Sequence, residues 1–381
     1  MDFQLTDDQK LIQETAQTFV KNESPVERMR RLREDERGWD PAVWKHMGEL
    51  GWLGLPFPEA LGGFGGSMVD VGLLLEPFGT TLVPEPYLPS VILGGMAVLH
   101  AGDGTQHSTY LEPMIAGDRS LALAYAERTS RYSPTTVTTR ADADGDGYRL
   151  TGEKVFVLNG HAAEHLVVSA RTAGRADDRD GIGLFVLDRG TDGVRVQSIR
   201  TMDGGRAALV TLEAARVERA AVLGDPAGAA PVLERVLDLA AAATCAEGLG
   251  ILTAVQAMTV DYLKTRKQFA VPIGLFQALQ HRAVDMFVQV ELCRGTAILA
   301  TAKADDDDPV ERARAVSIGK AQLAQGGFFV VAQGTQLHGG IGVTDEHDIS
   351  LYFKRLRSLN ALFGDEQYHL ERFASLPTFG P

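Results

Sequence analysis

The chain has 381 residues, of which 45% are hydrophobic and 23% are charged, and its formal net charge is -13. Because single hydrophobic cores stop growing near roughly 250 to 300 residues, this length predicts more than one structural unit. The acidic balance excludes general nucleic-acid binding, which needs basic residues gathered on one face to neutralise phosphates.

The cysteines and the apolar segments indicate where the protein resides. Cys245 and Cys293 stand in apolar, helix-like surroundings, which predicts buried core residues, no disulfide framework and a cytoplasmic location. The start of the chain lacks the pattern of a secretory signal. Segment 239–260 is weakly charged but contains a glutamate, a glutamine and several threonines, so we expect a buried helix and no membrane span.

Helix signals dominate the first third of the chain. Thr6 and Gln9 have the spacing of a capping box, which predicts a helix that begins directly after Thr6. Asp40 followed by Pro41 has the order of a helix start, a capping side chain and then a proline in the first turn. We therefore expect an N-terminal α-helical domain over residues 1–118.

The pattern changes at Ser120 to short β-prone runs that are separated by Gly and Asp turns such as 144–147. This predicts a central β domain over 119–225. Long apolar-periodic segments return from Pro231 and predict a C-terminal helical bundle over 226–381. The expected breaks between its helices lie at 269–274, 305–309 and 339–348.

Two common kinds of site are missing from the sequence. It contains no CxxC and no HExxH, and its nine histidines are scattered, so we expect no metal site. No glycine-rich turn follows a strand and opens a helix with an acidic residue downstream, which leaves a nicotinamide cofactor without a fingerprint.

Glu247 is the most informative single residue. It is the only charged side chain between Asp238 and Asp261, and alanines and other apolar residues surround it. Burial raises the pKa of a carboxyl group, and a glutamate moved toward neutrality is better matched to taking a proton from carbon. The alternative is a buried glutamate that pairs with an arginine from another helix. Spacing alone leaves both interpretations open.

Two further segments suggest contacts with a ligand. The first runs from Thr265 to Gln277 and combines a cationic turn with a proline break. The second, 336–342, contains three glycines whose backbone N–H groups are open to an anion. Each is weak alone, because an arginine at a helix end is usually a surface residue and a GGxG is usually a turn.

Together these segments resemble the acyl-CoA dehydrogenase family over essentially the whole chain. The stretches that carry the resemblance are TRKQFAVPIGLFQALQHRAVDM, QLHGGIGVTDEHDISLYFKR and GDGYRLTGEKVFVLNG. The resemblance implies that family's fold, with an N-terminal helical domain, a central β-barrel domain and a C-terminal four-helix bundle. It also implies a flavin-dependent oxidoreductase that acts on a CH–CH bond, with FAD as its cofactor.

The same resemblance implies which residues contact FAD. Those expected at the pyrophosphate and adenosine of a neighbouring subunit's FAD are Arg266, Phe269 and Gln277. Those expected to supply the matching surface are Gln336, Gly339 and Gly340. Phe156 matches the aromatic position packed near the isoalloxazine. FAD would then lie at a subunit interface, so an oligomer is implied.

The family's reaction removes two hydrogens from an acyl-CoA thioester. A carboxylate takes the α-proton, the β-hydrogen leaves as hydride to flavin N5, the product is the trans-2-enoyl-CoA, and an electron-transfer flavoprotein usually reoxidises the flavin. Many members take the base from a C-terminal Tyr-Glu-Gly-Thr loop, where this chain has Gly364 in the glutamate's place. A second group takes it from the helix that carries Glu247 here. Glu247 is therefore the expected base and Asp365 the alternative.

A second departure concerns the stretch 124–133. Most members have Thr-Glu-Pro and then Gly-Ser-Asp there, in contact with flavin and CoA, and only Glu127 is kept here. Leu158 likewise replaces a common threonine near flavin N5. The departures resemble the small subunits of heteromeric dehydrogenases of the pimeloyl-CoA or steroid side-chain type. We expect a related large subunit as partner, in an α2β2 assembly, or self-association.

Two competing functions stay open at this point. The chain is either the catalytic half or a non-catalytic subunit that completes its partner's FAD pocket, which the altered stretch 126–133 motivates. The other competitor is a flavin oxidase or monooxygenase on the same fold, which would need a flavin accessible to oxygen.

Overall fold

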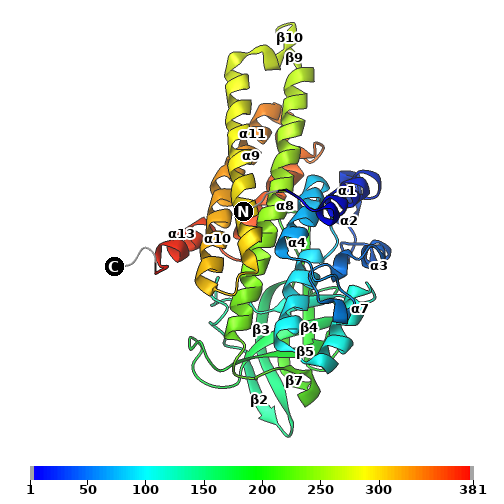
Figure 1. Cartoon of the computed structure of the whole chain (residues 1–381), viewed down its shortest axis with the longest axis vertical. Coiled ribbons are helices and arrows are strands. Elements are labelled where there is room, and N and C mark those ends of the chain that lie inside the picture. Colours follow the sequence, from blue (N-terminus) through cyan, green and yellow to red (C-terminus); the bar gives the residue numbers. More distant parts are fainter. Residues whose placement is uncertain (1–3, 378–381) are drawn as a thin grey trace. The chain divides into compact units, whose positions relative to one another are not determined.

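The computed structural model describes residues 4–377, and they form two compact units (Figure 1). We call the first the helical unit; its described part comprises residues up to Arg31, Ser67–Val83 and the chain from Ala241. The second, the sheet unit, comprises Leu32–Gly66 and Pro84–Ala240. Helix α8 (Ala230–Thr265) begins in the sheet unit and ends in the helical unit.

The sheet unit is built on one eight-stranded sheet in which neighbouring strands follow the order β6-β7-β3-β2-β4-β5-β8, with β1 beside β4. Its strands are β1 (Leu121–Ala124), β2 (Arg140–Asp144), β3 (Gly147–Leu158), β4 (His165–Arg171), β5 (Ile182–Asp188), β6 (Val194–Arg200), β7 (Arg206–Val217) and β8 (Val222–Leu223). Strand β4 pairs in parallel with β1 and β2, and the other pairs are antiparallel. The predicted turn at 144–147 connects β2 and β3, and Gly145 adopts a positive φ of 65° there.

Apolar residues of the central strands form the core of this unit. Side chains such as Leu166, Phe185 and Val210 are completely buried, whereas most residues of the edge strand β6 are exposed or half-buried. The helices of the unit are α3 (Pro41–Glu49), η1 (Trp52–Gly54), η2 (Glu59–Leu61), η3 (Leu88–Gly95), α5 (Met96–Ala101), α6 (Gly104–Gln106), η4 (His107–Leu111), α7 (Glu112–Ile115) and η5 (Arg219–Ala221). Asp40 caps α3 by accepting a hydrogen bond from the Ala42 N–H, as its order with Pro41 predicted.

The helical unit contains the longest helices of the chain. Besides the second part of α8 they are α1 (Asp7–Asn22), α2 (Val26–Leu32), α4 (Met68–Thr81), η6 (Ile273–Leu275), α9 (Gln277–Ala304), α10 (Pro309–Gln322), η7 (Leu323–Gly327), α11 (Phe328–His338), η8 (Gly339–Val343), α12 (Ile349–Ala361) and α13 (Glu366–Ala374). The capping box at Thr6 and Gln9 is confirmed by both of its hydrogen bonds. The expected breaks at 269–274, 305–309 and 339–348 also separate helices as predicted.

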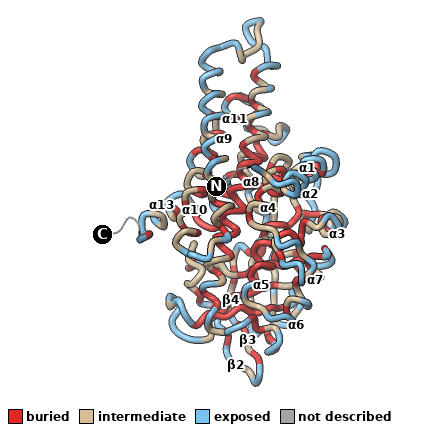
Figure 2. Tube along the Cα trace, viewed as in Figure 1, coloured by how far each residue is buried: buried red, intermediate tan, exposed pale blue. Residues whose placement is uncertain are grey.

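Helix α8 is the buried helix that the composition of 239–260 predicted. Among the described helices it alone is long and apolar enough to cross a membrane, but 89% of its apolar window is buried inside the protein, as in a core helix. Figure 2 shows this burial and the exposed turn beyond its end. Two glycines let α4 approach it closely, since a Cβ at Gly250 would lie 1.8 Å from the Glu76 carbonyl oxygen and one at Gly79 2.1 Å from that of Glu247. Cys245 and Cys293 are buried and free, as predicted.

A tight hairpin joins α8 to α9 within the helical unit. Strands β9 (Lys267–Gln268) and β10 (Val271–Pro272) pair antiparallel, and the two residues between them, Phe269 and Ala270, have φ angles of 52° and 63°. Side chains disfavour this left-handed region by about 1–2 kcal/mol per residue. Phe269 nevertheless stands 86% exposed at the tip, so the turn holds a large apolar side chain in solvent at a conformational cost.

Replacing Ala270 by glycine should therefore raise the free energy of unfolding by about 1 kcal/mol, because glycine adopts positive φ without steric cost. Urea denaturation measures the change. Ala278→Gly, at an exposed position inside α9, is the matched control and should lower stability by about 0.5–1 kcal/mol. Equal effects of the two substitutions would contradict strain at the hairpin.

Candidate active site

Glu247 and Arg355 form a buried ion pair inside the helical unit. Glu247 lies on α8 and is only 8% exposed, and Arg355 on α12 donates from Nε to its Oε1 atom over 2.7 Å. Among the described residues no other ion pair or side-chain hydrogen bond reaches this carboxylate. Its second oxygen, Oε2, is therefore left without a protein donor there.

This geometry corrects one part of the sequence interpretation. Glu247 is not isolated on its apolar helix, because the alternative of an arginine from another helix is realised by Arg355. The guanidinium supplies a counter-charge to the buried carboxylate. A base that takes a proton must start as a carboxylate, so the ion pair and a catalytic role are compatible.

The loop that carries the base in many relatives is closed to a larger side chain here. Gly364 has φ 121°, and a Cβ at that position would lie 2.4 Å from the Tyr368 ring and 2.5 Å from His369 Nε2. Asp365 is engaged as the N-cap of α13, where its Oδ1 accepts from the Tyr368 N–H at 2.9 Å. The capping bond aims this oxygen along the backbone of α13.

A buried lysine that the sequence analysis did not identify binds the backbone just before this loop. Lys320 on α10 is 1% exposed and donates to the carbonyl oxygens of Leu359 and Leu362, at 2.7 Å each. Burial lowers the pKa of Lys320 to about 8. The lysine thus adds a donor to two carbonyls at the C-terminal end of α12, of which that of Leu359 also accepts the Leu362 N–H. Nothing in its sequence surroundings marks it as buried.

The residues expected to contact FAD in the helical unit are all exposed. They are Arg266, Phe269 and Gln277 around the hairpin, and Gln336, Gly339 and Gly340 at the end of α11. A Cβ added at Gly339 or Gly340 would meet no atom within 4 Å, so both backbones face open space. These are the properties of a surface that a flat, charged ligand can approach.

An aromatic stack brings these two segments together. Tyr262, whose carbonyl accepts the Arg266 N–H at 2.9 Å, stacks on His338 with a ring separation of 4.5 Å. His338 directly precedes Gly339, and its ring centroid lies 4.6 Å from that of His347. The structure therefore places the Arg266 and Gly339 segments at one end of the unit. The sequence analysis missed Tyr262, because an aromatic residue near a helix end has no distinctive pattern.

In the sheet unit, Phe156 also points outward. It lies at a register shift of β3 between Lys154 and Val157, has φ 53° and is 43% exposed. A bulge of this kind bends the strand and re-aims a side chain. Phe156 is thus presented at the surface of a unit whose other large aromatic residues are mostly buried.

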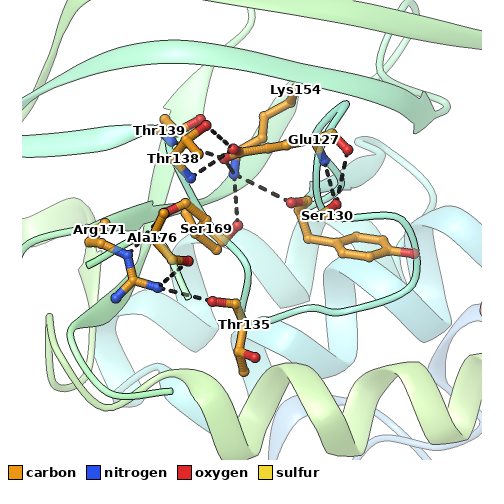
Figure 3. A network of polar contacts seen from close by, with 11 residues as sticks. Glu127, Ser130, Thr135, Thr138, Thr139, Lys154, Ser169, Arg171 and Ala176 are labelled. Carbon is orange, nitrogen blue, oxygen red and sulfur yellow. Dashed lines mark hydrogen bonds and ion pairs between the residues drawn. The ribbon is translucent and has the colours of Figure 1, made fainter. Parts of the chain in front are cut away.

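Glu127, the one family residue kept in its stretch, is buried in a polar network (Figure 3). Its carboxylate pairs with Lys154 Nζ at 2.7 Å and accepts from the backbone N–H groups of Thr138 and Thr139. Lys154 is completely buried and also donates to Ser169 Oγ. Burial raises the pKa of Glu127, but the charge and hydrogen bond of Lys154 outweigh it and lower the value to about 2. Glu127 therefore shapes the stretch from within.

Arg171, drawn in the same view, binds the backbone of two segments, 135–137 and 173–180 (Figure 3). Its guanidinium donates to six backbone carbonyls, those of Thr135, Val137, Ala173, Ala176, Asp178 and Asp180. Its pKa is lowered by burial. The altered stretch after β1 is thus ordered by buried charges in place of the usual sequence motif.

Three family models match the chain. They are the acyl-CoA dehydrogenase N-terminal domain over residues 6–118, the middle domain over 122–214 and the C-terminal domain over 227–375. The chain belongs to the acyl-CoA dehydrogenase family. The predicted fold class, with its helical, sheet and helical domains, is confirmed, and so is the oxidoreductase activity class.

Curated relatives and solved structures agree with this membership. The chain is 30% identical to a probable acyl-CoA dehydrogenase, YngJ of Bacillus subtilis, with 92% of each chain covered. It is also 30% identical to acyl-CoA dehydrogenase IpdE2 of Mycolicibacterium smegmatis, covering 97% of this chain and 98% of the relative. A chain of the ChsE4–ChsE5 complex from Mycobacterium tuberculosis matches all of both chains at 28% identity with a TM-score of 0.88. Some other relatives are named as reductases.

FAD is the cofactor of this acyl-CoA dehydrogenase, as predicted. The chain's own residues fit it, because the open glycine backbones at 339–340, the cationic Arg266 and the exposed ring of Phe269 share one end of the helical unit. Such a surface suits an anionic pyrophosphate and a stacked ring.

Glu127→Gln should destabilise the acyl-CoA dehydrogenase by about 3–5 kcal/mol, because it leaves the buried Lys154 without its counter-charge. Chemical denaturation at pH 7 measures this change. Glu153 lies next to Lys154 on β3 and forms an exposed ion pair with Arg128. Glu153→Gln is therefore the control and should cost no more than about 1 kcal/mol.

The difference between wild type and Glu127→Gln should also depend on pH. The folded pKa of Glu127, about 2, lies below its ordinary value of 4.5, so its contribution is complete above pH 4.5 and is lost as the pH falls toward 2. Denaturation at pH 7, 5 and 3.5 tests the trend. A difference that grows on acidification would contradict this assignment.

Proposed function

We propose that this chain is a catalytic subunit that dehydrogenates an acyl-CoA thioester to the trans-2-enoyl-CoA, with Glu247 as the base. The single observation that carries the proposal is the geometry of Glu247, a buried carboxylate with one oxygen held by Arg355 and the other without a protein donor among the described residues. A carboxylate oriented in this way accepts a proton without first breaking a hydrogen bond at the accepting oxygen.

Steric crowding in the C-terminal loop supports the same assignment. A glutamate at position 364 would collide with Tyr368 and His369, and Asp365 already caps α13. Movement of Asp365 toward a substrate would remove that cap. Of the two carboxylates predicted as base, Glu247 is therefore the better placed.

The remaining roles divide between the cofactor and the surfaces that hold it. FAD, when bound, supplies the acceptor for the hydride from Cβ. The residues that would hold it are Arg266, Phe269, Gln277, Gln336, Gly339, Gly340 and, from the sheet unit, Phe156. The chain's own contribution is to orient Glu247 through Arg355 and to shield it from water.

We further propose that the chain works with a related large subunit in an α2β2 assembly and passes electrons to an electron-transfer flavoprotein. The structural relatives above 25% identity include the ChsE4–ChsE5 complex and Tcur3481–Tcur3483, and the second is called a steroid acyl-CoA dehydrogenase. These relatives support a partner subunit and a thioester with a bulky acyl group.

Arg266→Ala should weaken FAD binding by about tenfold to a hundredfold, because a charge-assisted hydrogen bond contributes about 1.5–3 kcal/mol. Gly340→Val should weaken it as well, since the side chain would occupy the open space over the backbone. Flavin fluorescence during dilution of the co-expressed complex measures retention. Lys10→Ala, at an exposed position of α1, is the control and should retain wild-type flavin content. Unchanged retention in both site variants would refute the assigned FAD surface.

Glu247→Gln should reduce turnover by about 100-fold to 10,000-fold, the usual contribution of a general base, while flavin content stays at the wild-type level. Turnover is followed with an artificial electron acceptor and a panel of acyl-CoA thioesters. Asp261→Asn, an exposed carboxylate on the same helix, is the matched control and should stay within about twofold of wild type.

Other results of the same assay identify the competing functions. Full turnover by Glu247→Gln together with loss in Asp365→Asn would transfer the role of base to Asp365. Full turnover by both variants would make the chain a non-catalytic subunit that completes its partner's FAD pocket. Rapid peroxide formation without an added acceptor would indicate a flavin oxidase.

A further inference from the structure

We propose that Arg355 is a positioning residue of the reaction, which fixes one carboxylate oxygen of Glu247 so that the other receives the substrate proton. The inference rests on the proposed function and adds a residue to it. It assigns Arg355 a role in chemistry beyond joining α8 to α12.

The contact gives the two carboxylate oxygens of Glu247 different surroundings. Arg355 donates through Nε to Oε1 at 2.7 Å, and no hydrogen bond reaches Oε2 from the described residues. An arginine that bound both oxygens would block the base. The one-oxygen contact leaves Oε2 available and restricts rotation of the carboxylate about its last bond.

The helix that carries Arg355 is anchored at three points, which gives the guanidinium a defined place. Near its start, Asp348 accepts from Arg30 at 2.8 Å. Three residues before Arg355, the Tyr352 hydroxyl donates to the Thr80 carbonyl beyond the middle of α4. At its end, Lys320 binds the carbonyls of Leu359 and Leu362. Such anchoring positions a charged group without paying the entropy of ordering it at each turnover.

The other charged groups of the helices packed around Glu247 are engaged elsewhere. On α4, Glu76 pairs with Arg294 of α9 at 2.9 Å, and Asp70 accepts from Ser67 at the start of that helix. On α10, Lys320 donates to the two carbonyls of the α12 end. Within the described residues Arg355 is thus the charge that acts directly on Glu247.

Rotation of the carboxylate about its last bond would carry Oε2 out of line with the substrate proton. Such a misplacement lowers the rate of the chemical step and leaves substrate binding unchanged.

The test is the rate of flavin reduction in a single turnover, measured anaerobically with the holoenzyme complex at several concentrations of its best acyl-CoA thioester. In Arg355→Gln, which removes the guanidinium but keeps a donor, the maximal reduction rate should fall about tenfold to a hundredfold, while the half-saturating thioester concentration stays within about twofold. Arg357→Gln is the matched control, because Arg357 lies on the same helix and faces the Phe328 ring. It should keep the wild-type rate.

Arg355→Lys separates orientation from charge and serves if the glutamine variant does not fold. Lysine keeps the charge but lacks the planar guanidinium, so the maximal reduction rate should again fall about tenfold with the half-saturating thioester concentration unchanged. A wild-type maximal rate in Arg355→Gln or in Arg355→Lys would overturn the proposal. Its failure differs from failure of the proposed function, which shows as full turnover by Glu247→Gln.

Discussion

The buried ion pair between Glu247 and Arg355 is the interaction around which the helical unit is arranged. A charge on α8 is tolerated only because α12 brings a guanidinium to 2.7 Å, and breaking such a pair is usually far more costly than replacing it whole. Gly79 and Gly250 let α4 lie directly against α8 at this level. Lys320 holds the end of α12. The stability of the unit and the proposed chemistry therefore depend on the same contact.

The sheet unit also contains a buried ion pair, formed by Glu127 and Lys154. The stretch after β1 lacks most of the family's usual residues. The buried side chains of Glu127, Lys154 and Arg171 hold its backbone and the segment that follows it. Glu127 accepts backbone N–H groups of Thr138 and Thr139 while Lys154 neutralises its charge.

Local signals predicted much of the fold, since capping boxes, turn residues and hydrophobic periodicity act over a few positions. The cap at Thr6, the turn at 144–147 and the breaks around α9 all appear as predicted. The partner of Glu247 was foreseen only as an unspecified arginine, because Arg355 is 108 positions away and no local pattern connects them. Lys154 was missed, although its spacing of four from the buried Leu150 in β3 places it on the inward face.

The most direct test of the account is an anaerobic titration of the flavin in the purified complex of this chain and its co-expressed partner with a panel of acyl-CoA thioesters. The account predicts that a thioester bleaches the flavin absorbance of the wild-type complex and fails to do so when Glu247 is replaced by glutamine. A complex without flavin, or bleaching that is equally fast in the Glu247→Gln complex, would contradict it.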